Sequence, residues 1–315
     1  MSNLIVLTLV LLALSGVSLF VGVSQFSLAD IIAADPLAME LFWQSRIPRL
    51  TAILLSGACL SIAGLIMQQI SQNRFASPST SGTIESAMLG FVISLVLFGD
   101  GDHWLIIFAT ALLGTLLFMT VIARIRFKNA VFIPLVGIIY GNIISSLATF
   151  IAYRFDALQN LQSWAVANFA NLLQGDFELL YLAIPLGLFS YAYAVRIAAV
   201  GLGKDFAVNL GMNYTQVVFV GIVLVSVSAA CVVMIVGELP FLGLIVPNLV
   251  RYFCGDNLRK NIPITALSGA LLVLACDLVS RLVIFPYEVP ISMVISILGG
   301  AVFFVLIVKG HLHER

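Results

Sequence analysis

Charge is scarce in this sequence. Only 10% of the 315 residues are Asp, Glu, Lys or Arg, against about 25% in ordinary soluble domains. Hydrophobic residues make up 61% of the chain, and the mean hydropathy is +1.13. A soluble domain needs more polar surface than this composition supplies. The sequence therefore predicts an integral membrane protein.

Recognisable catalytic and metal-binding motifs are also missing. The sequence has no GxxxxGK[ST] phosphate loop, no HExxH or CxxC pair and no Ser-His-acid arrangement. Its cysteines occur singly within or beside apolar runs, where they are typical of small packing residues: Cys59, Cys231, Cys254 and Cys276. We therefore expect no enzyme activity, no cofactor and no metal site in this chain, and any nucleotide hydrolysis must come from a partner.

What the chain has in abundance is long apolar runs. About 20 apolar residues cross a hydrocarbon core of roughly 30 Å, and continuous runs favour helices over the alternating pattern of a barrel. The first run has no basic n-region and is too long for a signal peptide, so we expect a retained span. An all-α bundle of about ten transmembrane helices is predicted: Leu4 to Val23, Ile47 to Ile70, Thr83 to Phe98, Trp104 to Ala123, Ala130 to Tyr153, Leu179 to Ala199, Thr215 to Val236, Leu239 to Phe253, Ile262 to Phe285 and Val289 to Val308.

Two local patterns indicate how these helices pack. The eighth run is short and contains Pro240 and Pro247, so we expect it inside the bundle, where protein satisfies the backbone groups that proline frees. Small residues also share helix faces, which lets neighbouring backbones approach closely. They are Gly57, Ser61 and Gly64 on the second run and Gly137, Gly141 and Ser145 on the fifth.

Basic residues predict the orientation in the membrane. An even number of spans places both termini on one face, and with the termini cytoplasmic every Lys and Arg falls inside except Arg46, Arg49, Arg154 and Arg281. Two interpretations of the outer arginines stay open on pattern alone. They could snorkel to lipid phosphates, or they could dock acidic groups of a soluble partner through the planar arginine fork. Asp277 is placed to hold Arg281 through an i,i+4 pair.

Three stretches carry a family resemblance. "RIPRLTAILLSGACLSIAGLIMQQISQNRFASPSTSG", "GELPFLGLIVPNLVRYFCGDNLRKNIP" and "CDLVSRLVIFPYEVPISMVISILGG" resemble the iron-siderophore and cobalamin permease family of ABC importers. The resemblance implies a type II ABC importer permease whose residues 1–315 form one transmembrane domain in the bacterial cytoplasmic membrane. It also implies a second permease subunit, identical or paralogous, separate ABC ATPase subunits inside, an extracytoplasmic substrate-binding protein outside, contact with membrane lipid, and no nucleic-acid partner.

The resemblance further implies roles for particular residues. Arg46, Arg49 and Arg281 correspond to arginines that meet acidic residues of the binding protein. The stretch "GLGKDFAVNLGMN" resembles the segment that couples to the ATPase, although Lys204 and Asp205 stand where relatives carry a glutamate after the second glycine. The implied coupling residues are Gly201, Gly203, Lys204, Asp205 and Gly211, and the implied inner-gate residues are Asn73, Phe75, Ala130 and Val131.

The transported substrate is also indicated by resemblance. Cobalamin permeases read Asn-Pro-Leu where this chain has Asn73, Arg74 and Phe75. The stretch "QQISQNRFASPSTSGTIESAMLG" is more similar to permeases for catecholate-type ferric siderophores, so the resemblance favours such a siderophore over cobalamin. A cobalamin or haem permease of the same family and an ion-driven secondary transporter remain as alternatives. Two further acids, Glu85 and Glu238, lie within or beside spans, and we expect local hydrogen-bonded roles for both.

Overall fold

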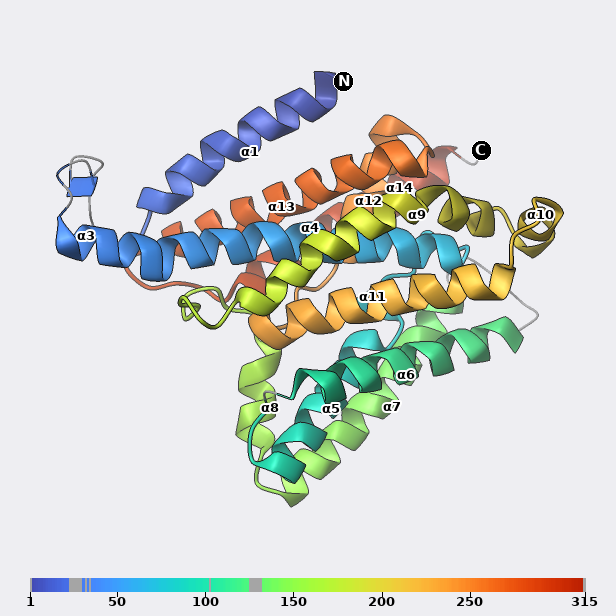
Figure 1. Cartoon of the computed structure of the whole chain (residues 1–315), viewed down its shortest axis with the longest axis horizontal. Coiled ribbons are helices and arrows are strands. Elements are labelled where there is room, and N and C mark those ends of the chain that lie inside the picture. The colour runs from blue at the N-terminus through green and yellow to red at the C-terminus, as the bar shows by residue number, and fades with distance from the viewer. Residues whose placement is uncertain are drawn as a thin grey trace.

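The computed structural model describes residues 2–22, 30–31, 33, 35–101, 103–124 and 132–313 (Figure 1). This part of the chain is helical, without a strand beyond two isolated bridges. The elements are α1 (Ser2–Phe20), α3 (Pro36–Leu41), η1 (Phe42–Arg46), α4 (Ile47–Ile70), η2 (Pro78–Thr80), α5 (Thr83–Phe98), α6 (Trp104–Arg124), α7 (Phe132–Arg154), α8 (Leu158–Ala165), η3 (Glu178–Leu182), α9 (Ala183–Gly201), α10 (Lys204–Asn209), α11 (Tyr214–Val236), α12 (Leu242–Cys254), α13 (Leu258–Leu282) and α14 (Ile291–His313).

Every predicted apolar run overlaps one of these helices. Within the described residues, six helical segments are long and apolar enough to span a membrane, and the shorter apolar helices are Leu4–Phe20, Thr83–Phe98, Leu242–Cys254 and Ile291–Val305. The all-α prediction is confirmed, with shifted boundaries. The first helix ends at Phe20, while Val23 and Ala130, predicted as span ends, lie outside the described residues.

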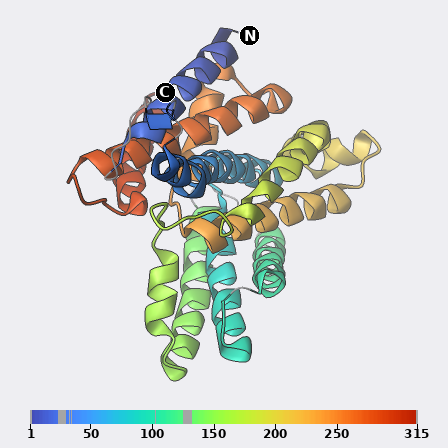
Figure 2. The same cartoon turned by 60° about the vertical axis from the view of Figure 1, so that its left-hand side comes forward.

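Helix α4 is the centre of the bundle. It runs along the long axis and packs against α13, α11, α9 and α12 (Figure 1). Helices α5 to α8 form a second group, which α11 joins to α4 through its contacts with α5 and α6 (Figure 2). Helix α4 has 24 residues and is therefore about 36 Å long. By itself it reaches from one end of the molecule to the other.

Small residues allow the close helix crossings, as predicted for two seams. On α4, Gly57 lies against the backbone of Gly269 and Gly64 against that of Gly243, so a Cβ atom at either glycine would overlap another helix. On α7, Gly137 lies against the carbonyl of Thr80. Ser145 departs from the prediction, because it lines a hollow at the surface of α7 rather than a helix crossing.

The short α12 lies inside the bundle, as its prolines predict, and its first five residues are all buried. Pro247 has no N–H to donate four residues back, so the carbonyl of Gly243 is released from the helical ladder. This carbonyl faces Gly64 of α4, where the missing side chain leaves room for it. A proline in one helix and a glycine in the other therefore make the α4–α12 crossing possible.

Candidate functional site

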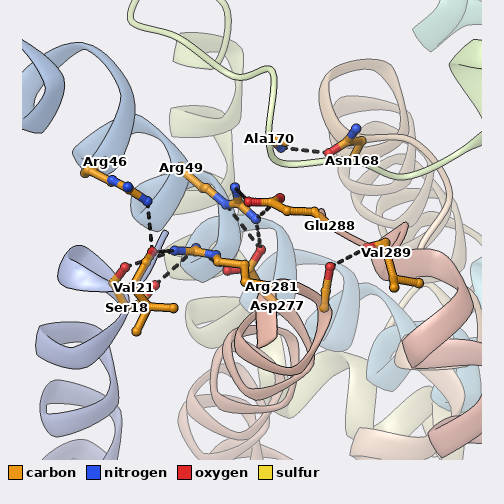
Figure 3. Close-up of polar contacts among 11 residues, drawn as sticks. Ser18, Val21, Arg46, Arg49, Asn168, Ala170, Asp277, Arg281, Glu288 and Val289 are labelled. Carbon is orange, nitrogen blue, oxygen red and sulfur yellow. Dashed lines mark hydrogen bonds and ion pairs between the residues drawn. The ribbon is translucent and has the colours of Figure 1, made fainter. Parts of the chain in front are cut away.

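An arginine cluster, comprising Arg46, Arg49, Arg281, Asp277 and Glu288, lies where α4 begins and α13 ends (Figure 3). Arg49 makes a two-pronged pair with Glu288, in which Nη1 donates to Oε1 at 2.9 Å and Nη2 to Oε2 at 2.8 Å. Its Nη2 also donates to Oδ1 of Asp277 at 2.8 Å. One guanidinium thus holds two carboxylates from elements distant in sequence.

Asp277 joins the two buried arginines. Its Oδ2 accepts a hydrogen bond from Nη2 of Arg281, which confirms the predicted i,i+4 pair. The Asp277 side chain is only 1% exposed, so its negative charge is balanced by arginines rather than by water. The two arginines and the aspartate form a buried charge network between α4 and α13.

The arginines also hold the end of α1. Nη1 of Arg281 donates to the carbonyls of Ser18 at 3.0 Å and Val21 at 2.9 Å, and Nη1 of Arg46 donates to the same Val21 carbonyl at 2.9 Å (Figure 3). The last carbonyls of a helix lack intrahelical partners and carry partial negative charge. Cationic side chains at this position therefore fasten α1 to the bundle.

The three predicted docking arginines differ in how much of each side chain is exposed to solvent. The side chains of Arg49 and Arg281 are 8% and 2% exposed, whereas Arg46 is half-buried. The guanidinium groups of Arg49 and Arg281 are directed at this chain's own acids and carbonyls, which does not fit snorkelling to lipid. Sequence reasoning missed Glu288, a lone acid in the loop between α13 and α14, because only the fold brings that loop to Arg49.

Acid is expected to weaken the Glu288–Arg49 pair. Burial acts to raise the pKa of Glu288, but hydrogen bonds from Arg49 and the charges of Arg49, Arg281 and Arg46 outweigh it, so the pKa lies below its usual value. The stabilisation is therefore complete above the ordinary glutamate pKa of about 4.3 and is lost as the pH falls through the lower folded value.

Thermal unfolding of the wild type and Glu288→Gln between pH 3 and pH 7 measures this effect. We expect the wild type to melt at a higher temperature at pH 7 and the difference to shrink below about pH 4. A difference that stays constant over the whole range would contradict the assignment.

The predicted coupling segment, residues 201–213, lies at the opposite end of the bundle (Figure 1). Between α9 and α11 this segment forms one short helix, α10. Gly203 (φ 116°) and Gly211 (φ 74°) bracket α10 with backbone angles that favour glycine. Lys204 and Asp205 are exposed in its first turn. Apolar side chains are exposed beside them: Leu202, Phe206, Val208 and Leu210.

The structure describes two of the four predicted inner-gate residues. Asn73 is buried, and its Oδ1 accepts a hydrogen bond from the Phe75 N–H at 2.8 Å. The Phe75 ring meets that of Phe303 on α14 edge to face, with 6.0 Å between centroids. Ala130 and Val131 lie outside the described residues.

The expected hydrogen-bonded role of Glu85 is not seen for one of its two carboxylate oxygens. Its carboxyl lies against Gly141 of α7, and its buried Oε2 has no hydrogen-bond partner among the described residues. Glu238 is half-buried in the loop before α12, where its backbone N–H donates to the carbonyl of Ala165. In the part of the chain that the structure describes, no group of three or more His, Cys, Asp or Glu side chains could hold a metal ion.

Both the sequence and the fold match known proteins. The profile of the FecCD transport family matches residues 7–309. The petrobactin import system permease protein YclN of Bacillus subtilis (strain 168) is 44% identical over 96% of this chain and 97% of its own length. The ferric-anguibactin transport system permease protein FatD of Vibrio anguillarum is 36% identical, covering 94% of this chain and 96% of the relative. The vitamin B12 import system permease protein BtuC of Vibrio cholerae is 30% identical over 95% and 92%.

The fold has a solved counterpart. A protein described as a metal-chelate-type ABC transporter, in an inward-facing conformation, superposes with a TM-score of 0.80 and 26% identity over 97% of this chain and 98% of that one. Fold and sequence together define a multi-pass membrane permease of the ABC importer type. The chain belongs to the FecCD transport family.

Proposed function

We propose that this chain is the membrane-spanning subunit of an ATP-driven importer that carries a ferric siderophore of catecholate type across the cytoplasmic membrane. The observation that carries the proposal is the 44% identity, along nearly the whole chain, to a petrobactin import permease. The anguibactin permease adds a second siderophore relative. Cobalamin is the alternative substrate, because a vitamin B12 permease is 30% identical.

In the proposed assembly, residues 1–315 act as one permease domain with both termini in the cytoplasm. A second permease subunit, identical or paralogous, completes the translocation path, and separate ATPase subunits hydrolyse ATP. Support for an ATPase contact at the coupling segment comes from its exposed apolar side chains, which water does not favour and a protein groove would bury. Gly201, Gly203, Lys204, Asp205 and Gly211 belong to this contact.

The arginine cluster is the proposed docking site for a substrate-binding protein. It contains three arginines against two carboxylates, so it attracts an acidic partner. Half-buried Arg46 is placed to make the first contact. Arg49 and Arg281 then hold this end of the bundle together, and Arg49 offers its guanidinium fork if a partner's carboxylate replaces Glu288. Asn73, Phe75, Ala130 and Val131 are the proposed residues of the inner gate.

Uptake in cells tests the substrate and the docking site together. Cells with and without the gene receive radio-iron-loaded petrobactin, anguibactin and a hydroxamate siderophore, and labelled cobalamin. We expect loss of the gene to abolish uptake of a catecholate-type chelate and Arg46→Glu to reduce it about tenfold, equivalent to ~1.4 kcal/mol in partner binding. The matched control is Arg154→Glu, an exposed arginine at the end of α7, which should keep at least half of the uptake.

Other outcomes are equally informative. Loss of cobalamin uptake alone would replace the siderophore with the alternative substrate. Uptake that continues when the ATPase partner cannot hydrolyse ATP would contradict the proposed mechanism. Equal defects in Arg46→Glu and Arg154→Glu would contradict docking at the arginine cluster.

A further inference from the structure

The end of α4 carries an unusual residue. Ser71 caps the helix, the N–H of Asn73 donates to the carbonyl of Gln68 at 3.0 Å, and the N–H of Gln72 donates to that of Gln69 at 3.1 Å. This pair of bonds is the Schellman arrangement, whose left-handed position is usually a glycine. Here that position is Gln72, with φ 51°. A side chain at an unfavourable backbone angle suggests that the side chain itself has a task.

The Gln72 side chain reaches both ends of the coupling segment. Its Nε2 donates to the carbonyl of Val200, the residue before Gly201, at 3.3 Å. The same atom lies 3.5 Å from the hydroxyl of Tyr214, the residue after Asn213. Both contacts are at the long limit for hydrogen bonds, so the Gln72 amide follows the coupling segment through two weak contacts used together.

A second contact from the same turn supports this arrangement. The side-chain oxygen of Gln69 lies against Gly201 so closely that a Cβ on Gly201 would overlap it. Gln69 and Gln72 therefore contact the coupling segment where α9 ends. Figure 1 shows the ends of α4 and α9 and the start of α11 gathered beside α10.

The residues after Gln72 lead directly to α12 and α14. The carbonyl of Arg74 accepts a hydrogen bond from Nδ2 of Asn248 on α12 at 2.9 Å. The Phe75 ring packs on Phe303 of α14, and Phe303 in turn packs on Phe241 with 6.3 Å between ring centroids. The loop Asn73–Phe75 thus contacts α12 and α14, and it follows Gln72 directly in the sequence.

We propose that Gln72 is a positioning residue that transmits displacement of the coupling segment to the loop Asn73–Phe75. The inference rests on the proposed function, in which the coupling segment contacts the ATPase and this loop closes the inner end of the path. Helix α4 is packed against α13, α11, α9 and α12, so it serves as the fixed support. Movement at Val200 and Tyr214 then pulls on the Gln72 side chain and turns the loop that follows it.

The substitution Gln72→Gly isolates the side chain. Glycine suits the left-handed backbone, so the variant should fold at least as stably as the wild type while losing both contacts. We expect uptake per transporter to fall at least fivefold in proteoliposomes that hold the complete transporter. ATP hydrolysis should stay within twofold and the melting temperature should be unchanged or higher. The probe is the ferric siderophore that the wild type takes up in the panel above.

Two comparisons sharpen the test. Gln72→Asn keeps an amide on a residue that tolerates this backbone but shortens its reach, so its uptake should fall between that of the wild type and Gln72→Gly. Gln174→Gly removes an exposed glutamine from the loop before η3 and should leave uptake unchanged. Normal uptake by Gln72→Gly, or losses of uptake and ATP hydrolysis in equal proportion, would overturn the inference. Failure of the proposed function itself would appear in the wild type, as absence of ATP-driven uptake.

Discussion

Replacing Asp277 with asparagine is expected to lower the free energy of unfolding by about 3 kcal/mol, because removal of one partner leaves buried charge without compensation. Asp277 is 1% exposed and bonds to both Arg49 and Arg281. Asparagine has nearly the same volume, so the effect measures charge and hydrogen bonding rather than a cavity. Denaturant or thermal unfolding of the purified protein in detergent provides the measurement.

The chain offers a matched control for this experiment. Asp256 pairs with Arg251 at 2.6 Å, but its side chain is 68% exposed. Water and salt screen such a pair, so Asp256→Asn should cost less than about 1 kcal/mol. Equal effects of the two substitutions would show that the buried network contributes no more than a surface pair. That result would contradict the role assigned to Asp277.

The second large effect is expected from Gly64→Ala. A single methyl group at this position would overlap the backbone carbonyl of Gly243. Neither group can rotate away, because a Cβ is fixed by its own backbone and the carbonyl is part of the α12 backbone. Helices α4 and α12 would have to move apart, at a cost of about 3 kcal/mol or more. We expect a lower melting temperature and a smaller monodisperse fraction in size-exclusion chromatography.

Gly187→Ala is the control for this substitution. A Cβ at Gly187 on α9 would lie 3.6 Å from Cδ1 of Ile62 on the same α4, an ordinary contact. Alanine is also the better helix former, so this variant should be neutral or more stable by up to ~1 kcal/mol. If Gly64→Ala were tolerated equally well, the close α4–α12 crossing would not be needed for stability.

Local features of the fold could be predicted because they depend on short stretches of sequence. A run of apolar residues predicts a span wherever it occurs, and every predicted run overlaps a helix. The interior position of α12 followed from Pro240 and Pro247, since proline at membrane depth needs protein around it. The Asp277–Arg281 pair followed from helical spacing alone.

Features of the site that join distant segments could not be predicted in this way. Arg49 stood out as an outer arginine, but its partners Asp277 and Glu288 lie 228 and 239 residues further along the chain. The left-handed backbone of Gln72 was equally hidden, because a glutamine carries no signal for that conformation. Its two contacts exist only because α4, α9 and α11 end at the same place.

Apolar runs, prolines and helical spacing thus determined by themselves that this protein is an all-α membrane protein with an interrupted helix inside the bundle. They act over a few residues, and neighbours in sequence remain neighbours in any fold. Only the tertiary structure decided that Glu288 meets Arg49, that Gly64 admits the freed carbonyl of Gly243, and that Gln72 reaches Val200. These contacts depend on how whole helices cross, and the crossings result from packing summed over the entire bundle.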